Sequence, residues 1–271
     1  MLLGRGRGFA LPEVLVGLVL LGVIGTVLVR STLGQGRILR GLRERIAVQG
    51  EFGLGTDYLG SELAGLSRSD LVRVSRESVS YRALRLSGLA CLVTPSEVRI
   101  LEDRLSAVRS PQSGRDSLLL YTGADSVVGG AGRGWVSLPI AGVIRSACGT
   151  RAALSFTTTV DSGTVGPASW PELAPVRTFE IMEARFYLSA GSTWLGARSV
   201  TSGETVQPLA GPFEATGTGF EFFDSAGAPT AVPETVRHIR INLAARAVGW
   251  DGSRGAHAMN ATTSILPENL W

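Results

Sequence analysis

The chain has 271 residues, of which 44% are hydrophobic, with 35 glycines and 12 prolines. This composition fits one β-rich globular domain of about 200 residues together with a long helix, and it excludes a disordered tail. The 26 basic residues, all of them arginine, nearly balance 23 acidic residues, so no strong general attraction to nucleic acid is predicted. Arginine-rich DNA binding stays open as an alternative.

A long apolar segment near the N-terminus contains one carboxylate. The segment runs from Phe9 to Val29, 21 residues, and Glu13 is its only charged residue. As a helix rising about 1.5 Å per residue it would be roughly 32 Å long, enough to cross a bilayer core. A charge in hydrocarbon costs about 2.5–3.5 kcal/mol, so Glu13 would need a compensating partner there. The alternative is an acidic residue that falls by chance near the start of a plain membrane anchor.

The order of features around this segment differs from that of a secretory signal peptide. Such a signal has an apolar stretch of about 7–15 residues followed by a cleavage site made of small residues. Here the apolar stretch is longer and residues 29–32 offer no such site. The candidate cleavage residue, Gly8, instead precedes the apolar segment and follows a basic leader with Arg5 and Arg7. Cleavage at Gly8 would remove the leader, residues 1–8, and keep the helix.

Residues 8–16 resemble the processing signature of type IV prepilins. They read Gly-Phe-Ala-Leu-Pro-Glu-Val-Leu-Val: a glycine, an aromatic new N-terminus, a short apolar stretch and a glutamate. The resemblance implies that a prepilin peptidase cuts between Gly8 and Phe9 on the cytoplasmic side and N-methylates Phe9. It also implies that Glu13 pairs with the new amino terminus of a neighbouring subunit during assembly, which would compensate the cost of both charges.

The distribution of arginines predicts the orientation of the chain in the membrane. Arg5 and Arg7 precede the helix without any acidic residue between them, so the positive-inside rule keeps the N-terminus cytoplasmic. Five arginines after the helix oppose this orientation: Arg30, Arg37, Arg40, Arg43 and Arg45. A long downstream domain is translocated largely regardless of charge, so we place residues beyond about 30 in the periplasm.

Residues 30–66 are expected to continue the helix with one apolar face. Apolar residues recur at intervals near three, four and seven, which is the pattern of an amphipathic helix. They are Ile38, Leu42, Ile46, Phe52, Leu59, Leu63 and Leu66. We expect this face to pack on the sheet of the head. Glycine costs about 1 kcal/mol relative to alanine in a helix, so four glycines predict a kink or local melting. They are Gly50, Gly53, Gly55 and Gly60.

Residues 67–271 are predicted to form a β-rich periplasmic head with a mostly antiparallel sheet. Short apolar runs alternate there with turn residues. The predicted strands are Val79–Leu86, Glu97–Leu101, Asp116–Tyr121, Trp135–Ile140, Ala153–Thr158, Arg177–Leu188, Thr193–Val200, Gly219–Phe223 and Thr235–Ala245. The predicted fold class is therefore α+β, with the membrane half of a long helix followed by an amphipathic half that packs on the sheet.

The C-terminal strands carry a second resemblance. A Pro-Leu-Ala segment (residues 208–213), an aromatic strand with an acidic-glycine hairpin (219–227) and an alternating final strand (236–243) follow one another. This order is similar to that in PilW-like minor pilins and in the J-type pseudopilin of type II secretion. The resemblance covers about 40 residues and implies a pilin-like head. Residues 66–175 show no such resemblance.

Cys91 and Cys148 are the only cysteines, and both fall in the expected periplasmic head. An even pair in an oxidising compartment predicts a disulfide, which would close a loop of 57 residues and contribute about 2–4 kcal/mol. Two separate buried thiols are the alternative. With two histidines and no further cysteine, a zinc site of the Cys/His type is not available.

Motifs for chemistry are few. The glycine-rich loop at 129–134 lacks the Gly-Lys-Ser/Thr ending of a P-loop and is expected to be a hairpin tip. No Gly-x-Ser-x-Gly elbow with a histidine partner is present. We therefore expect a structural subunit and no enzyme, without cofactor or metal.

The expected location is the bacterial inner membrane and then a filament. Its expected partners are the prepilin peptidase, other pilins or pseudopilins, an inner-membrane assembly platform and the lipid bilayer. One alternative is a type II secretion pseudopilin. The alternative of another class is a membrane-anchored extracytoplasmic binding domain or hydrolase.

Overall fold

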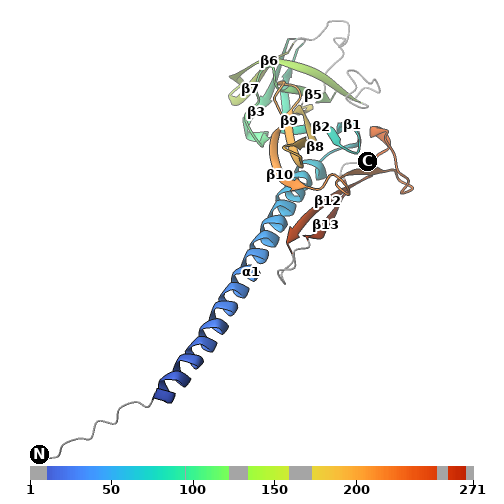
Figure 1. The fold of residues 1–271 in the computed structure, drawn as a ribbon. Coiled ribbons are helices and arrows are strands. Elements are labelled where there is room, and N and C mark those ends of the chain that lie inside the picture. Colours follow the sequence, from blue (N-terminus) through green and yellow to red (C-terminus); the bar gives the residue numbers. More distant parts are fainter. Residues whose placement is uncertain (1–10, 95, 122–133, 159–172, 249–255, 267–271) are drawn as a thin grey trace, which may run out of the picture. The chain divides into compact units, whose positions relative to one another are not determined.

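The computed structural model describes residues 11–94, 96–121, 134–158, 173–248 and 256–266 (Figure 1). Gly8, Phe9 and most of the glycine-rich loop at 129–134 lie outside the described residues. The internal contacts of the chain divide it into two units. One comprises Met1–Gly50 and Arg246–Met259, and the other comprises Glu51–Ala245 and Asn260–Trp271, which we call the head unit.

One helix, α1 (Leu11–Ala64), accounts for the N-terminal part of the chain. It matches the two predicted helical segments, 9–29 and 30–66, to within two residues at each end. The expected local melting at the four glycines is wrong, because α1 is unbroken through Gly50, Gly53, Gly55 and Gly60. Gly55 lies where a Cβ would come 3.3 Å from Leu195 and 3.5 Å from Ala210, so its small size permits close packing. Such tertiary packing overrides the low helix propensity of glycine.

The apolar face expected along residues 30–66 is buried only in its C-terminal part. Phe52, Leu59 and Leu63 are buried in the head unit, with 8%, 0% and 0% exposure. Upstream, the expectation is contradicted: Ile38, Leu42 and Ile46 are 41%, 43% and 66% exposed. The change from exposed to buried side chains falls near Gly50, where the head unit begins. The periodic pattern alone does not show which part of a helix has a sheet beside it.

Thirteen strands and three short 3₁₀ helices follow α1 within the described residues. The strands are β1 (Leu71–Val74), β2 (Ser78–Val93), β3 (Glu97–Leu101), β4 (Ser106–Ala107), β5 (Ser117–Tyr121), β6 (Trp135–Cys148), β7 (Arg151–Thr158), β8 (Pro175–Ser189), β9 (Ser192–Ser199), β10 (Gln207–Phe213), β11 (Gly219–Phe223), β12 (His238–Val248) and β13 (Ala256–Ile265). The 3₁₀ helices are η1 (Arg68–Asp70), η2 (Glu102–Arg104) and η3 (Pro233–Thr235).

Each of the nine predicted strands overlaps an observed strand, which confirms the β-rich character of the head. Four strands were not among those predicted: β1, β4, β10 and β13. β10 contains Pro208, Gly211 and Pro212, residues that are typical of loops, and it lies at the end of a sheet where a missing N–H is tolerated. The last predicted strand begins too early, since residues 233–235 form η3 and β12 starts at His238.

Six strands of the larger sheet are hydrogen-bonded in a closed ring. β1 to β10 form a ten-stranded sheet in which the strand pairs of the described residues are antiparallel. Six of its strands follow the order β2-β3-β7-β6-β5-β8, and the ring is closed because β8 also pairs with β2. Side chains from these strands fill the interior of the ring, as in small barrels. The largest are Leu86, Val98, Ile100, Leu118, Leu120, Val136, Leu138, Ile140, Phe156 and Val176.

The strands β9 and β10 extend this sheet beyond β8, and Figure 1 shows β2, β8, β9 and β10 side by side. The head part of α1 packs against them. The Phe52 ring stacks on Phe213 of β10 with centroids 6.0 Å apart, and the Glu51 carboxylate accepts the Gly211 N–H at 2.9 Å. The structure is therefore α+β, with one long N-terminal apolar helix and a large, mostly antiparallel sheet.

A second sheet contains β11, β12 and β13 in that order. The alternation predicted for residues 236–243 is confirmed in β12, where Ile239, Ile241 and Leu243 are buried; Val236, which precedes the strand, is buried as well. Arg240 on the other face pairs with Glu221 of β11 at 3.1 Å. β12 is therefore a strand with one buried and one solvent-exposed face, as the sequence pattern indicates.

Candidate functional site

The first half of α1 exposes apolar side chains along its whole length. Between Leu11 and Val29, thirteen large apolar side chains are each at least half exposed. A helix that is apolar on all sides requires a non-aqueous environment or a protein partner. Among the described residues, α1 is the one helix long and apolar enough to cross a membrane. Its length and composition are compatible with single-pass membrane anchoring.

The predicted assembly residue lies at the start of this helix. Glu13 is in the first turn of α1 and is exposed. An acidic side chain at this position interacts favourably with the positive end of the helix dipole, by about 0.3–1 kcal/mol at an exposed site. Gly8 and Phe9, the residues on either side of the predicted cleavage site, lie outside the described residues.

A buried cluster of charged side chains lies in the head unit and contains none of the predicted site residues. We call Glu180, Arg85, Arg109, Arg115 and Asp116 the Glu180 cluster. Glu180, on β8, has a side chain that is 2% exposed. Its carboxylate accepts hydrogen bonds from the Nε atoms of Arg85 and Arg115, both at 2.6 Å, and pairs with Arg109 at 3.1 Å. Three guanidinium groups therefore surround one buried carboxylate.

Asp116 supplies a second buried carboxylate to this cluster. Arg109 donates two hydrogen bonds to it, at 2.6 and 2.7 Å, in the bidentate arrangement that suits a guanidinium and a carboxylate. The Gln112 N–H donates a third at 2.7 Å. These contacts hold the segment between β4 and β5 in one conformation, and the pairs of Arg109 and Arg115 with Glu180 attach it to β8.

The cluster also reaches α1 and the β9–β10 connection. Glu62, in the last turn of α1, pairs with Arg85 at 3.3 Å and accepts a hydrogen bond from the Tyr81 hydroxyl at 3.3 Å. Burial, together with the Glu62 carboxylate, raises the pKa of Tyr81 well above its usual value, so the phenol stays protonated and donates. Arg115 pairs with Glu204 at 2.8 Å. The cluster thus ties the end of α1, two strands and two loops together.

A β-bulge explains how Arg85 comes to be buried. The register between β2 and β8 shifts between Leu84 and Leu86, which leaves Arg85 without a direct partner in the ladder. A bulge changes the direction of the side chains that follow it. Arg85 can therefore pair with Glu180 while its neighbour Leu86 packs inside the ring.

The charges of the cluster hold its residues in place and leave Glu180 unsuited to proton transfer. Burial raises the pKa of Glu180, but the hydrogen bonds from Arg115, Arg85 and Arg109 lower it more, to about 2. A carboxylate with this pKa stays ionised near neutral pH, whereas a general acid or base needs a pKa near the working pH. The arrangement supports a structural role.

The lowered pKa of Glu180 predicts a loss of stability in acid. Because the folded-state pKa is about 2 and the ordinary value is 4.5, the stabilisation is complete above pH 4.5 and is lost as the pH falls toward 2. The stabilisation is about 3 kcal/mol, at 1.36 kcal/mol per pKa unit. The difference in unfolding free energy between the wild type and Glu180→Gln should shrink by this amount from pH 6 to pH 2. Urea titrations across this range measure it, and a constant difference would contradict the assignment.

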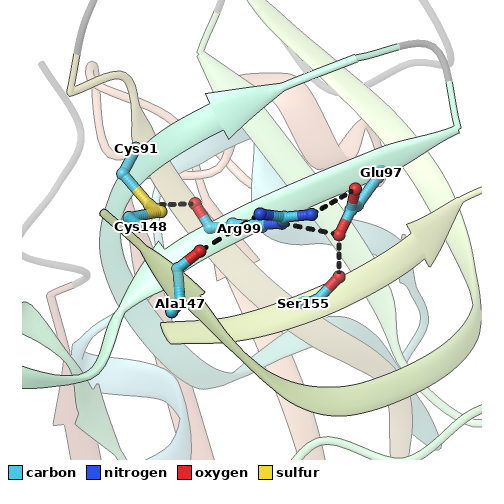
Figure 2. The surroundings of a disulfide bond; sticks show 6 residues. All are labelled: Cys91, Glu97, Arg99, Ala147, Cys148 and Ser155. Carbon is cyan, nitrogen blue, oxygen red and sulfur yellow. Dashed lines mark hydrogen bonds and ion pairs between the residues drawn. A yellow bond between two sulfur atoms is a disulfide. The ribbon is translucent and has the colours of Figure 1, made fainter. Parts of the chain in front are cut away.

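The two cysteines are joined by a disulfide, as the sequence predicted. Figure 2 shows the bond between Cys91, near the end of β2, and Cys148, at the end of β6, with Cα atoms 6.3 Å apart. This separation is normal for a disulfide. β3 and β7 lie between these strands in the ring, so the bond joins strands that are not neighbours. The alternative of two separate thiols is wrong.

Polar contacts surround the disulfide (Figure 2). Arg99 donates to the carbonyl of Ala147 at 3.1 Å and to Glu97 at 2.7 and 3.1 Å. Ser155 donates to the same Glu97 carboxylate at 2.5 Å. These contacts join β3, β6 and β7 next to the disulfide, which joins β2 and β6. The disulfide sulfur of Cys91 lies 3.4 Å from the Arg99 carbonyl oxygen, and this is a contact without a proton.

Reduction of the disulfide is expected to destabilise the head unit by about 2–4 kcal/mol, because the unfolded chain gains the freedom of a loop with 57 residues between the cysteines. Urea unfolding of the full chain in detergent, with and without reductant, measures the effect. The double variant Cys91→Ser, Cys148→Ser is the control and should not respond to reductant. Equal midpoints for the oxidised and reduced wild type would contradict this expectation.

The Glu180 cluster was not predicted from the sequence. The available signal was a charged residue between apolar residues in a predicted strand, as in Leu84-Arg85-Leu86 and Phe179-Glu180-Ile181. The usual interpretation of that pattern is a solvent-exposed face. The ion pair between Arg85 and Glu180 can therefore be recognised only in the tertiary structure. Within the described residues, no group of three or more His, Cys, Asp or Glu side chains could hold a metal ion.

Comparisons with known proteins give no match. No protein-family model matches the chain, and neither does any curated protein or solved structure. A functional proposal therefore rests on the residues and geometry of the chain itself.

Proposed function

We propose that this chain is a structural subunit of a type IV pilus-like filament, a minor pilin or pseudopilin. The precursor is cut by a prepilin peptidase between Gly8 and Phe9, and Phe9 is N-methylated. α1 anchors the subunit in the bacterial inner membrane, with the N-terminus cytoplasmic and the head periplasmic, until the subunit enters a filament. Its partners are other pilins or pseudopilins, the inner-membrane assembly platform and the bilayer.

The observation that carries the proposal is Glu13 in the first turn of a helix that is apolar and exposed on all sides. The sequence motif Gly8-Phe9 stands directly before this helix. A carboxylate in hydrocarbon is costly, and the amino terminus of a processed neighbour is an opposite charge that would reach the same depth. Pairing of the two charges favours transfer of the helix from lipid into a bundle of like helices.

The head unit supports a pilin-like arrangement of helix and sheet. The last part of α1 is built into the head through Phe52, Leu59 and Leu63, and Glu62 ties it to β2. A helix fixed in this way to an antiparallel sheet can transmit the position of the anchor to the head. The similarity of residues 208–243 to the J-type pseudopilin keeps a type II secretion pseudopilin as the alternative form of the same proposal.

Mass spectrometry of the mature N-terminus tests the processing step. The expected first residue is Phe9, carrying one methyl group. An intact Met1 or a cut after residue 30 would reject the proposal and favour a membrane-anchored binding domain or hydrolase.

Replacing Glu13 with alanine tests the assembly step. Cleavage at Gly8 is expected to proceed normally, while incorporation into filaments falls about tenfold or more, because the amino terminus of the neighbour loses its counter-charge. Quantitative immunoblots of sheared filaments against whole cells give the incorporated fraction. Gln49→Ala, which changes another exposed polar residue of α1, is the matched control. Normal incorporation of the Glu13 variant would count against the pairing.

A further inference from the structure

An open cleft in the head unit is lined by two arginines. The turn between β1 and β2 contributes Arg76 and Glu77, the end of β8 contributes Arg185, Tyr187 and Leu188, and the connection from β10 to β11 forms the remaining wall. The cleft has a volume of about 890 Å³. That volume is within the range of about 300–1,000 Å³ that is typical of ligand sites.

A buried donor in this cleft lacks an acceptor. The Nε atom of Arg185 is buried, yet no described residue accepts a hydrogen bond from it. Buried polar atoms in proteins are almost always paired, and an unpaired donor costs about 1–3 kcal/mol. Arg76 is exposed at the same cleft, and no described side chain forms an ion pair with it. Arg185 and Arg76 therefore both line this cleft without an ion-pair partner among the described residues. The Arg185 Nε atom itself is shielded, so a ligand in the cleft would meet the terminal nitrogens of that guanidinium group.

The walls of the cleft are fixed by backbone hydrogen bonds. The Arg76 carbonyl accepts the Phe220 N–H, and the Glu77 carbonyl accepts the Phe186 N–H, both at 2.8 Å. Gly219 packs against the stem of Arg76, since a Cβ there would lie 3.0 Å from the Arg76 Cγ. The cleft is thus preformed, and binding would require little ordering of the chain.

The chemistry of the walls selects among possible anions. A guanidinium group presents a planar fork of donors that matches a carboxylate or a phosphate. The Glu77 carboxylate in the same cleft repels a doubly charged phosphate more strongly than a singly charged carboxylate. Leu188, which lines the same cleft, is 71% exposed and offers apolar contact, which free phosphate does not use. The cleft is also much larger than one carboxylate group.

We propose that this cleft binds an acidic side chain of a partner polypeptide, with Arg185 and Arg76 holding the carboxylate and Leu188 contacting an apolar neighbour of the acidic residue. The proposal does not depend on the filament role, because the cleft lies in the head unit and involves neither Glu13 nor the first half of α1.

The test uses the full chain in lipid nanodiscs, labelled with ¹⁵N-arginine and titrated with acetylated, amidated Leu-Glu-Leu. We expect a saturable shift of the Arg185 Nε–H resonance, which is assigned by its loss in Arg185→Gln. Leu-Gln-Leu should bind about tenfold more weakly or worse, because it lacks the charge that strengthens hydrogen bonds to guanidinium. Arg76→Gln, a change at an exposed side chain that should leave folding intact, should weaken Leu-Glu-Leu binding by a similar factor.

Arg145→Gln is the matched control, since Arg145 is an exposed arginine on β6 outside the cleft. It should leave the affinity for Leu-Glu-Leu unchanged. Equal binding of the Glu and Gln peptides, equal loss in the Arg145 and Arg76 variants, or no saturable shift would overturn the proposal. A saturable shift with inorganic phosphate and none with Leu-Glu-Leu would overturn it in favour of a phosphate site.

Discussion

Replacing Glu180 with alanine is expected to destabilise the head unit by about 3–5 kcal/mol. The substitution leaves Arg85, whose side chain is 9% exposed, without its closest counter-charge, and it removes a partner from Arg109 and Arg115. Breaking a buried ion pair by deleting one partner costs this much because the remaining charge stays buried and poorly solvated. The same loss would release the segment between β4 and β5 and the end of α1 from a common anchor.

Urea unfolding of the full chain in detergent, followed by intrinsic fluorescence, measures this effect. Glu221→Ala is the matched control, because Glu221 pairs with Arg240 at a similar distance of 3.1 Å but both side chains are 40% or more exposed. Exposed pairs contribute about 0–1 kcal/mol. If both variants unfold at the same urea concentration, the Glu180 cluster does not stabilise the head in the way its geometry indicates.

Leu59→Ala is expected to cost about 2–5 kcal/mol of unfolding free energy. The Leu59 side chain is completely buried on the face of α1 that packs in the head unit, so the substitution removes apolar contacts and leaves a cavity. The size of the cost depends on how far the neighbouring side chains can relax into the space. The same urea titration measures it.

Leu54 provides the control on the same helix. It is 60% exposed and lies five residues earlier, so Leu54→Ala should change the unfolding free energy by no more than about 0.5 kcal/mol. Both variants have the same change in helix propensity, and the comparison therefore isolates packing. Similar values for the two variants would mean that the end of α1 does not belong to the core of the head.

The helix and most strands could be predicted because their patterns are strong and local. α1 combines a long apolar run with helical spacing, and both signals are independent of what lies nearby. The strands at Glu97–Leu101 and Gly219–Phe223 were predicted to the residue, since turn residues mark both of their ends. β10 was omitted because its prolines and glycine are typical of loops, and only its place at the sheet end makes a strand possible.

The closure of the ring could not be predicted. It depends on eleven residue pairs between β2 and β8, whose members are about 90 to 110 residues apart in sequence. The bulge at Arg85 is likewise a product of these pairings, and no local motif marks it. The exposure of Ile38, Leu42 and Ile46 could not be predicted either, because an amphipathic pattern does not show where along the helix the packing surface ends.

The candidate sites divide in a similar way. The disulfide was predicted from the count of cysteines and the expected compartment, and the structure confirms it. Glu13 was found from its setting in an apolar run, and its pairing with a neighbour stays a prediction. The Glu180 cluster and the arginine cleft could not be found from sequence, because each gathers residues from several separate segments.

The closed ring of strands affects how copies of this protein can pack next to one another. Each of the six strands in the ring is hydrogen-bonded to a neighbour on both sides. A strand from another molecule therefore finds no row of unpaired N–H and C=O groups along them. At one end of the remaining path, β10 is engaged by α1 through Glu51. The six strands of the ring therefore offer a neighbouring copy no free edge on which to build a shared, aggregated β-sheet.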